Sequence, residues 1–178
     1  MHSSVAGPED GRTANLLGTL ALALAGEVEG ALQDEAGLGG SDAAALITLR
    51  NYAEGETIDM LRRVLRLSQP GAVRLVDRLA SRGLVERGRS ERDARAVSLR
   101  LTPSGRLAAD VATAARARVL EPALEPLERE ERLAFTAALE KLLAAQTTDG
   151  MSANQLCRLC DADVCGHPDR CPVTRAIA

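Results

Sequence analysis

The chain contains 178 residues with a formal net charge of −3, and it has no tryptophan, one tyrosine and one phenylalanine. This shortage of aromatic rings counts against a protein that stacks single-stranded bases on aromatic side chains. A core of leucine, alanine and valine favours helices, so we expect a mainly α-helical fold of one domain or two small ones.

Residues 1–13 lack the basic opening and the cleavage pattern of a signal peptide, and we expect them to be disordered. The longest apolar run, residues 16–26, is about half as long as a membrane span and ends at Glu27 and Glu29. We therefore expect a cytoplasmic protein with no membrane partner.

Apolar residues then recur at helical spacing over residues 14–36, and the GLGG sequence at 37–40 ends this helix. Ser41 and Asp42 can cap a second helix, and Thr57 can start a short third one.

Ser68 is expected to cap a fourth helix with a proline in its first turn, and Gly83 ends this helix. Its apolar face comprises Ala72, Leu75, Val76 and Leu79.

The period of the pattern changes from 3.6 to 2 after the fourth helix. Residues 84–90 and 96–102 are short strand-like runs separated by a charged ERDAR sequence, which predicts a β-hairpin. Thr102 is expected to cap a long helix that begins at Pro103 and is interrupted by prolines, and a further amphipathic helix is expected over residues 128–146. The order of three helices followed by a hairpin is that of a winged helix-turn-helix, here residues 41–102.

The charges are unevenly distributed. Residues 61–118 carry fourteen arginines and five acids, whereas residues 1–60 carry two arginines and ten acids. Arginine supplies 21 of the 22 basic residues, and its planar guanidinium suits phosphates and guanine edges. A basic section between acidic flanks indicates a phosphate-binding module.

Residues 67–106 contain five short motifs in order: SQP, RLVDRL, RGLVER, D-x-R and LT-x-x-G. In these motifs the chain resembles the MarR family of bacterial winged helix-turn-helix transcriptional regulators. The resemblance implies a homodimer in which residues 14–36 and 103–150 form a helical dimerisation platform. It implies a regulator, most commonly a repressor, that binds a pseudo-palindromic duplex operator and is nucleoid-associated when bound. A small-molecule effector is a possible further partner.

The fourth helix and the wing supply the expected DNA contacts. Gln69, Val73 and Arg74 lie opposite the apolar face and can meet base edges, with Arg74 as the best candidate for a bidentate guanine contact. Phosphate contacts are expected from Arg78 and Arg82. The full predicted DNA-binding set is Ser68, Gln69, Val73, Arg74, Arg78, Arg82, Arg92 and Arg95, with Arg95 in the minor groove and Asp93 supporting the wing.

No motif predicts an enzyme, because the chain lacks a G-x-S-x-G sequence, a phosphate-cradling glycine loop and a pair of catalytic carboxylates. The alternative function is a metal- or iron–sulfur-dependent redox protein whose winged domain mediates protein contacts.

All four cysteines lie in the tail, residues 151–178, with the spacing C-x2-C-x4-C-x5-C. The expected metal ligands are Cys157, Cys160, Cys165 and Cys171, with His167 as a possible substitute ligand. Zinc is the first choice, since four thiolates form a normal structural zinc shell. An iron–sulfur cluster and a metal-free redox switch remain open alternatives. The site could fasten the tail to the dimerisation platform, or it could act as a sensor.

Overall fold

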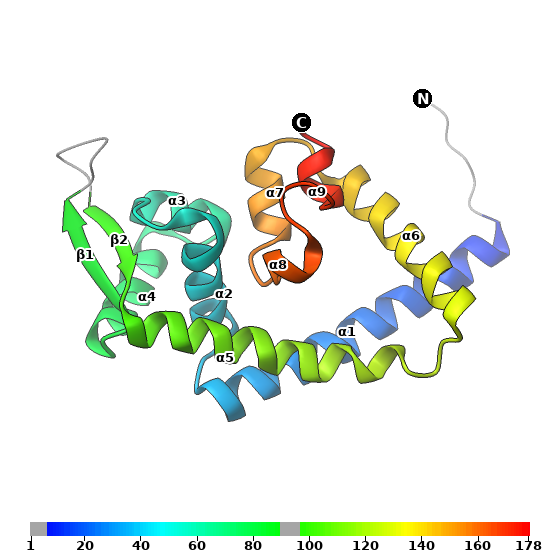
Figure 1. Cartoon of the computed structure of the whole chain (residues 1–178), viewed down its shortest axis with the longest axis horizontal. Coiled ribbons are helices and arrows are strands. Elements are labelled where there is room, and N and C mark those ends of the chain that lie inside the picture. The colour runs from blue at the N-terminus through cyan, green and yellow to red at the C-terminus, as the bar shows by residue number, and fades with distance from the viewer. Residues whose placement is uncertain (1–6, 90–96) are drawn as a thin grey trace.

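The computed structural model describes residues 7–89 and 97–178 (Figure 1). The elements, in chain order, are α1 (Pro8–Ala36), α2 (Gly40–Thr48), the π-helical segment η1 (Leu49–Ala53), α3 (Ile58–Val64), α4 (Gln69–Ser81), β1 (Val85–Arg89), β2 (Val97–Leu101), α5 (Pro103–Leu120), the 3-10 turn η2 (Pro122–Leu124), α6 (Arg129–Gln146), α7 (Gly150–Leu156), α8 (Ala162–Cys165) and α9 (Pro172–Arg175). The predicted fold, mainly α with a two-stranded wing, is confirmed.

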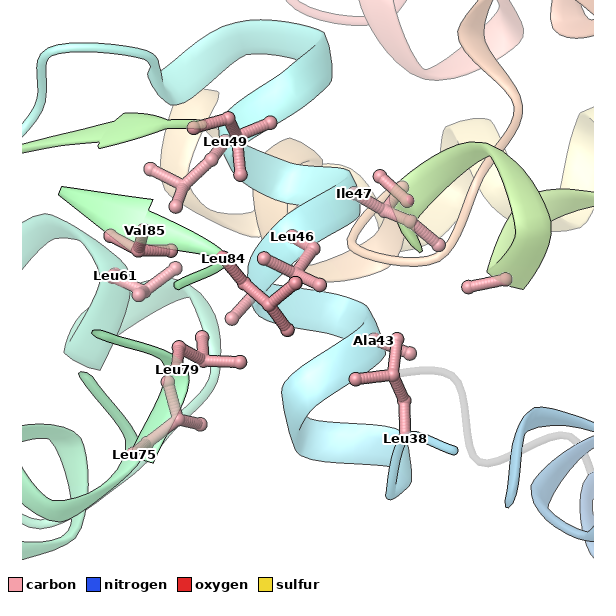
Figure 2. Packing of buried hydrophobic residues seen from close by; sticks show 14 of the residues in the cluster. Leu38, Ala43, Leu46, Ile47, Leu49, Leu61, Leu75, Leu79, Leu84 and Val85 are labelled. Carbon is pink, nitrogen blue, oxygen red and sulfur yellow. The ribbon is translucent and has the colours of Figure 1, made fainter. Parts of the chain in front are cut away.

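The segment from α2 to β2 forms a compact head around one apolar core (Figure 2). The predicted apolar face of α4 is buried in this core. Three predicted caps are also present. The side chains of Thr57, Ser68 and Thr102 accept hydrogen bonds from the backbone N–H groups of Met60, Gly71 and Gly105. These caps define where α3, α4 and α5 begin, and so set the orientation of α4 on the head.

The wing is an antiparallel hairpin in which Val85 pairs with Leu101 and Arg89 pairs with Val97. Its tip, including Arg92, Asp93 and Arg95, lies outside the described residues, so the roles predicted for these three remain predictions.

Gly105, in the LT-x-x-G motif, stands where the first turn of α5 crosses the end of the α4–β1 connection. A Cβ atom at this position would overlap the backbone carbonyl of Leu84. Only glycine permits this close approach of two backbones, which fixes α5 against the head.

Helix α1 begins earlier than predicted. Residues 8–13, expected to be disordered, are its first two turns, while residues 1–6 lie outside the described part of the chain. The reason is local. Pro8 occupies the first helical position, and the Asp10 carboxylate accepts a hydrogen bond of 3.0 Å from the Gly7 N–H.

Helices α1 and α5 extend away from the head side by side and form the first arm. Helix α6 turns back from the far end of α5 and forms the second arm (Figure 1). The C-terminal part of α1 packs on α5 through Val28 and Leu32. Further out, α1, η2 and α6 enclose an apolar groove of about 490 Å³. It is lined by Leu17, Leu20, Ala21, Leu24, Leu120, Ala123, Leu124, Pro126, Leu127, Phe135 and Leu139.

Helix α1 exposes several large apolar side chains. Residues Glu9–Ala36 are long and apolar enough to cross a membrane by length and composition alone, and most of this helix is not buried within the chain.

The tail, α7 to α9, lies between the second arm and the head (Figure 1). It contacts α6 through α9 and the head through α7, which packs on α3. The sequence left open whether the cysteine site fastens the tail or acts as a sensor, and the tail contacts both α6 and the head.

Candidate nucleic-acid interface and cysteine cluster

The outer face of α4 carries the residues predicted to meet base edges. Gln69, Val73 and Arg74 are exposed on the side opposite the buried core face, and Val73 is 37% exposed. Arg74 forms no ion pair or side-chain hydrogen bond among the described residues. Its guanidinium therefore remains available for a ligand outside the chain. Ser68 uses its hydroxyl to cap the helix, and Arg82 is exposed at the C-terminal end.

Arg78 has a different environment from the one expected. Its Nε and Nη2 donate hydrogen bonds of 3.0 and 2.5 Å to the two carboxylate oxygens of Asp42 on α2. The Asp42 side chain is 7% exposed and that of Arg78 is 49% exposed. The hydrogen bond with Asp42 raises the pKa of Arg78. Arg78 thus joins α4 to α2, and its partner is Asp42, which was expected to cap α2. The Gly40 N–H at the start of α2 instead donates to the Glu29 carboxylate at 2.9 Å.

Replacing Arg78 by alanine should therefore lower the stability of the head. The substitution leaves a buried carboxylate without its partner, a loss of roughly 1–3 kcal/mol once the solvation of the exposed guanidinium is discounted. The urea midpoint of unfolding measures this effect, with Arg82→Ala as the control. An unchanged midpoint for Arg78→Ala would contradict the structural role.

Asp77 is an acidic residue on the exposed face of α4 that the sequence analysis did not single out. Its carboxylate accepts a 2.5 Å hydrogen bond from Arg87 on β1. This exposed ion pair joins α4 to the wing, and it occupies the guanidinium of one arginine of the basic section.

Other arginines of the basic section pair with acids from residues 1–60, so part of the charge separation seen in the sequence is neutralised in space. Besides Arg78–Asp42, these pairs are Arg62–Asp59, Arg106–Glu54 and Arg118–Glu35. The cations left for a phosphate backbone are thus fewer than the composition indicated.

The four cysteines are brought together at the centre of the tail. Their thiols are free, and the Sγ atoms of Cys165 and Cys171 are 3.8 Å apart. The thiols of Cys157 and Cys160 also interact, since their mutual hydrogen bond lowers the pKa of Cys157 and raises that of Cys160. Cys160 in turn interacts with Cys165, and Cys157 with Cys171.

The two C-terminal thiols differ in acidity. Burial, followed by the charge of Cys160, raises the pKa of Cys165 to about 12. Burial also opposes ionisation of Cys171, but hydrogen bonds from Thr174 outweigh it and lower the pKa of Cys171.

The cluster is not arranged as a preformed metal site. In the part of the chain that the structure describes, no three His, Cys, Asp or Glu side chains have that arrangement. His167 is exposed, and its Nδ1 lies 2.9 Å from the Thr174 hydroxyl. Binding a metal would thus require the adjacent thiols to reorient.

The loop between the first two cysteines is seated on the head. The Tyr52 hydroxyl donates a hydrogen bond to the Cys157 carbonyl, and Asn51 Nδ2 donates to the Cys160 carbonyl at 2.9 Å. Burial, followed by the charges of the neighbouring cysteines, raises the pKa of Tyr52. Leu159 packs against the main core.

A cavity of about 770 Å³ lies between the first arm, the head and this loop. Its polar lining includes Glu29, Asp42, Arg78 and Arg158, and its apolar lining includes Val28 and Leu159. The cysteine segment thus forms one wall of the crevice between arm and head.

Comparison with known proteins agrees with this architecture. A family model described as MarR family matches residues 36–96, which excludes the cysteine segment. The chain is similar to a MarR family protein from Bacillus stearothermophilus, with 27% identity and a TM-score of 0.70, covering 78% of this chain and 95% of that one. A search of curated protein sequences found no match.

Two similar structures contain DNA. One is a mutant of S. aureus MepR bound to an oligodeoxyribonucleotide, with 19% identity and a TM-score of 0.57, covering 75% of this chain and 96% of that one. The other is a mutant of E. coli MarR complexed with operator DNA, with 24% identity and a TM-score of 0.56, covering 71% of this chain and 93% of that one. These likenesses establish the winged-helix fold of MarR-family regulators.

Proposed function

We propose that this chain is a MarR-family transcriptional regulator that binds duplex DNA as a homodimer, and that it is a repressor with no enzymatic activity. The observation that supports this most strongly is the outer face of α4, where an unpaired arginine stands beside Gln69 and Val73 at the start of a helix capped by Ser68. A helix presented in this way fits the major groove. The wing then reaches the flanking minor groove, and the protein acts in the cytoplasm where the DNA lies.

A second copy of the chain is the proposed cover for the apolar arms. The exposed leucines of α1 and α6 face the same groove from two sides, which a neighbouring pair of helices can fill. A membrane would cover α1 but leave the opposite wall, on α6, without a partner. The homodimer also supplies the two recognition helices that a pseudo-palindromic operator requires.

The proposed repression follows from occupancy, since a dimer bound across an operator excludes other proteins from the same DNA. The cavity between arm and head is the proposed place for a small-molecule effector. Its paired Asp42 and Arg78, together with Arg158, offer hydrogen bonds to a polar ligand, while Val28 and Leu159 offer apolar contacts.

Titration of the full-length protein into duplex DNA at increasing salt tests DNA binding. For a dimer making six or more phosphate contacts, affinity should fall by roughly 1000-fold or more between about 50 and 200 mM salt. Affinity that does not change with salt would contradict the proposed function.

The four cysteines are proposed to hold one metal ion, with zinc as the first choice and an iron–sulfur cluster as the second. Four sulfurs about 2.3 Å from a zinc ion stand about 3.8 Å from one another, and the Cys165–Cys171 separation is already 3.8 Å. One pair of thiols thus already has the separation that a tetrahedral ion requires, and the side chains of Cys157 and Cys160 would have to turn inward to complete the shell.

Protein purified without oxygen should be colourless and contain one zinc per chain. Metal analysis and an absorption spectrum measure this, and Cys157→Ser should release the metal because it removes one of four thiolates. If the protein instead contains iron and sulfide and absorbs visible light, the bound group is an iron–sulfur cluster and not zinc. Four reactive thiols with no metal would overturn the proposed site.

A further inference from the structure

Gln155 on α7 forms hydrogen bonds with the chain segment that leads from α3 to α4. Its Oε1 accepts hydrogen bonds from Arg66 Nε at 2.9 Å and from Arg66 Nη2 at 2.7 Å. Its Nε2 donates to the backbone carbonyl of Arg63 at 3.0 Å. One amide thus contacts the backbone of the last turn of α3 and the side chain of Arg66 in the connection between α3 and α4.

This connection has a conformation that needs support. Arg66 has a φ of 53°, in the left-handed region that residues other than glycine rarely adopt. It stands two residues before Ser68, the N-cap of α4. Strained backbone persists where surrounding contacts hold it, so the contacts of Gln155 help to fix the direction in which the recognition helix leaves the turn.

The same helix leads into the cysteine cluster. Helix α7 has only seven residues, and Cys157 is its C-terminal cap. Helices α8 and α9 have four residues each. Helices this short do not persist alone in water, so their positions depend on their mutual packing and on any link between their cysteines. A metal bound by all four thiolates would join all three.

The tail is also anchored at its far side. Cys171 and Val173 pack with Ala153 of α7 in a small second core, and α9 contacts α6. A chain of contacts therefore runs from the second arm through the cysteine cluster and α7 to the turn before α4. Because the two arms belong to the proposed dimer platform, this chain joins the platform to the recognition helix by a route separate from α5.

We propose that metal binding at the four cysteines tightens DNA binding by fixing α7 so that Gln155 holds the Arg63–Arg66 turn. This inference rests on the proposed function. The two α4 helices of a dimer must enter half-sites at a fixed spacing. A head that is contacted by both α5 and α7 occupies the required orientation for a larger fraction of the time than a head contacted by α5 alone. Metal and DNA then bind with a positive coupling, which is reciprocal by linkage.

The test compares duplex affinity with and without zinc in three full-length proteins: the unaltered chain, Gln155→Ala and Gln146→Ala. Gln146 is a matched control, because it is an exposed amide at the end of α6 whose side chain has no hydrogen bond among the described residues. Zinc is removed with a chelator and restored as the free ion, and metal content and circular dichroism are recorded for every sample.

Removal of zinc should weaken duplex binding of the unaltered chain and of Gln146→Ala by about tenfold, within the usual range of such coupling. Gln155→Ala should retain one zinc per chain and bind the duplex more weakly, with less than about a twofold response to zinc. In the reverse experiment, saturating duplex should raise the zinc affinity of the unaltered chain by the same factor.

The outcomes separate this inference from the proposed function. If the protein binds duplex DNA in a salt-dependent manner but binds it equally well or more tightly without zinc, the proposed coupling is wrong. The proposed function as a DNA-binding regulator is then unaffected. A Gln155→Ala protein that responds to zinc like the unaltered chain would overturn the route through Gln155. Absence of duplex binding in both metal states would overturn both proposals.

Discussion

Replacing Arg74 by alanine should abolish much of the preference of the protein for its own operator. Arg74 is exposed near the middle of α4 and has no side-chain partner among the described residues, so its guanidinium is free to meet a guanine edge. A bidentate arginine–guanine contact provides about 1–3 kcal/mol of discrimination. A homodimer loses it at both half-sites, which corresponds to roughly 30-fold or more in specific affinity.

The matched control is Arg82→Ala, which removes an exposed arginine from the C-terminal end of the same helix. Arg82 is predicted to contact a phosphate in each half-site, so this variant should weaken binding to all duplexes by a similar factor and reduce the salt slope by about two, one for each chain. The two effects are measured by titrating a selected operator and an unrelated duplex with each variant. If both variants weaken both duplexes equally, Arg74 does not contribute base discrimination.

Replacing Leu20 by aspartate should separate the proposed dimer and remove DNA binding with it. The Leu20 side chain is 48% exposed in the single chain and lines the apolar groove between α1, η2 and α6. If a second copy covers this groove, the substitution places a carboxylate in an apolar interface, at a cost of roughly 3–5 kcal/mol per chain. Because the dimer is twofold symmetric, the interface contains two such carboxylates and the cost applies twice.

Sedimentation measures the mass of the unaltered chain and of the variant, and duplex titration measures the loss of affinity. The control is Leu22→Asp on the same helix, because Leu22 is 78% exposed and lies outside the groove lining. A monomeric unaltered chain would contradict the proposed dimer. Association of the unaltered chain with lipid vesicles would instead favour a membrane as the cover for α1.

The sequence predicted the head well because its signals are local. The apolar spacing in α4 identifies Ala72, Leu75, Val76 and Leu79 as the buried face, and all four are buried. The caps at Thr57, Ser68 and Thr102 follow from hydroxyl side chains placed before apolar runs, and these caps are present. The change of period after Gly83 predicted the hairpin, which is also present.

The interactions that the sequence did not predict join distant parts of the chain. The residues around Asp42 in the sequence suggest that it caps α2, but its side chain is buried and pairs with Arg78, which is 36 residues away. Asn51 and the Cys160 carbonyl are separated by 109 residues, and no periodicity relates them. The bridging position of the tail could therefore not be predicted from spacing, although the spacing did identify the four cysteines as one cluster.

In the proposed complex, two chains present two α4 helices to one duplex. Selection of binding sites from a random duplex library by the full-length, metal-loaded protein tests it most directly. The enriched sequences should be pseudo-palindromic, with half-sites centred about 10 base pairs apart or a multiple of that spacing, and should bind two chains per duplex. Recovery of no enriched sequence, together with binding that does not weaken as salt increases, would contradict the account.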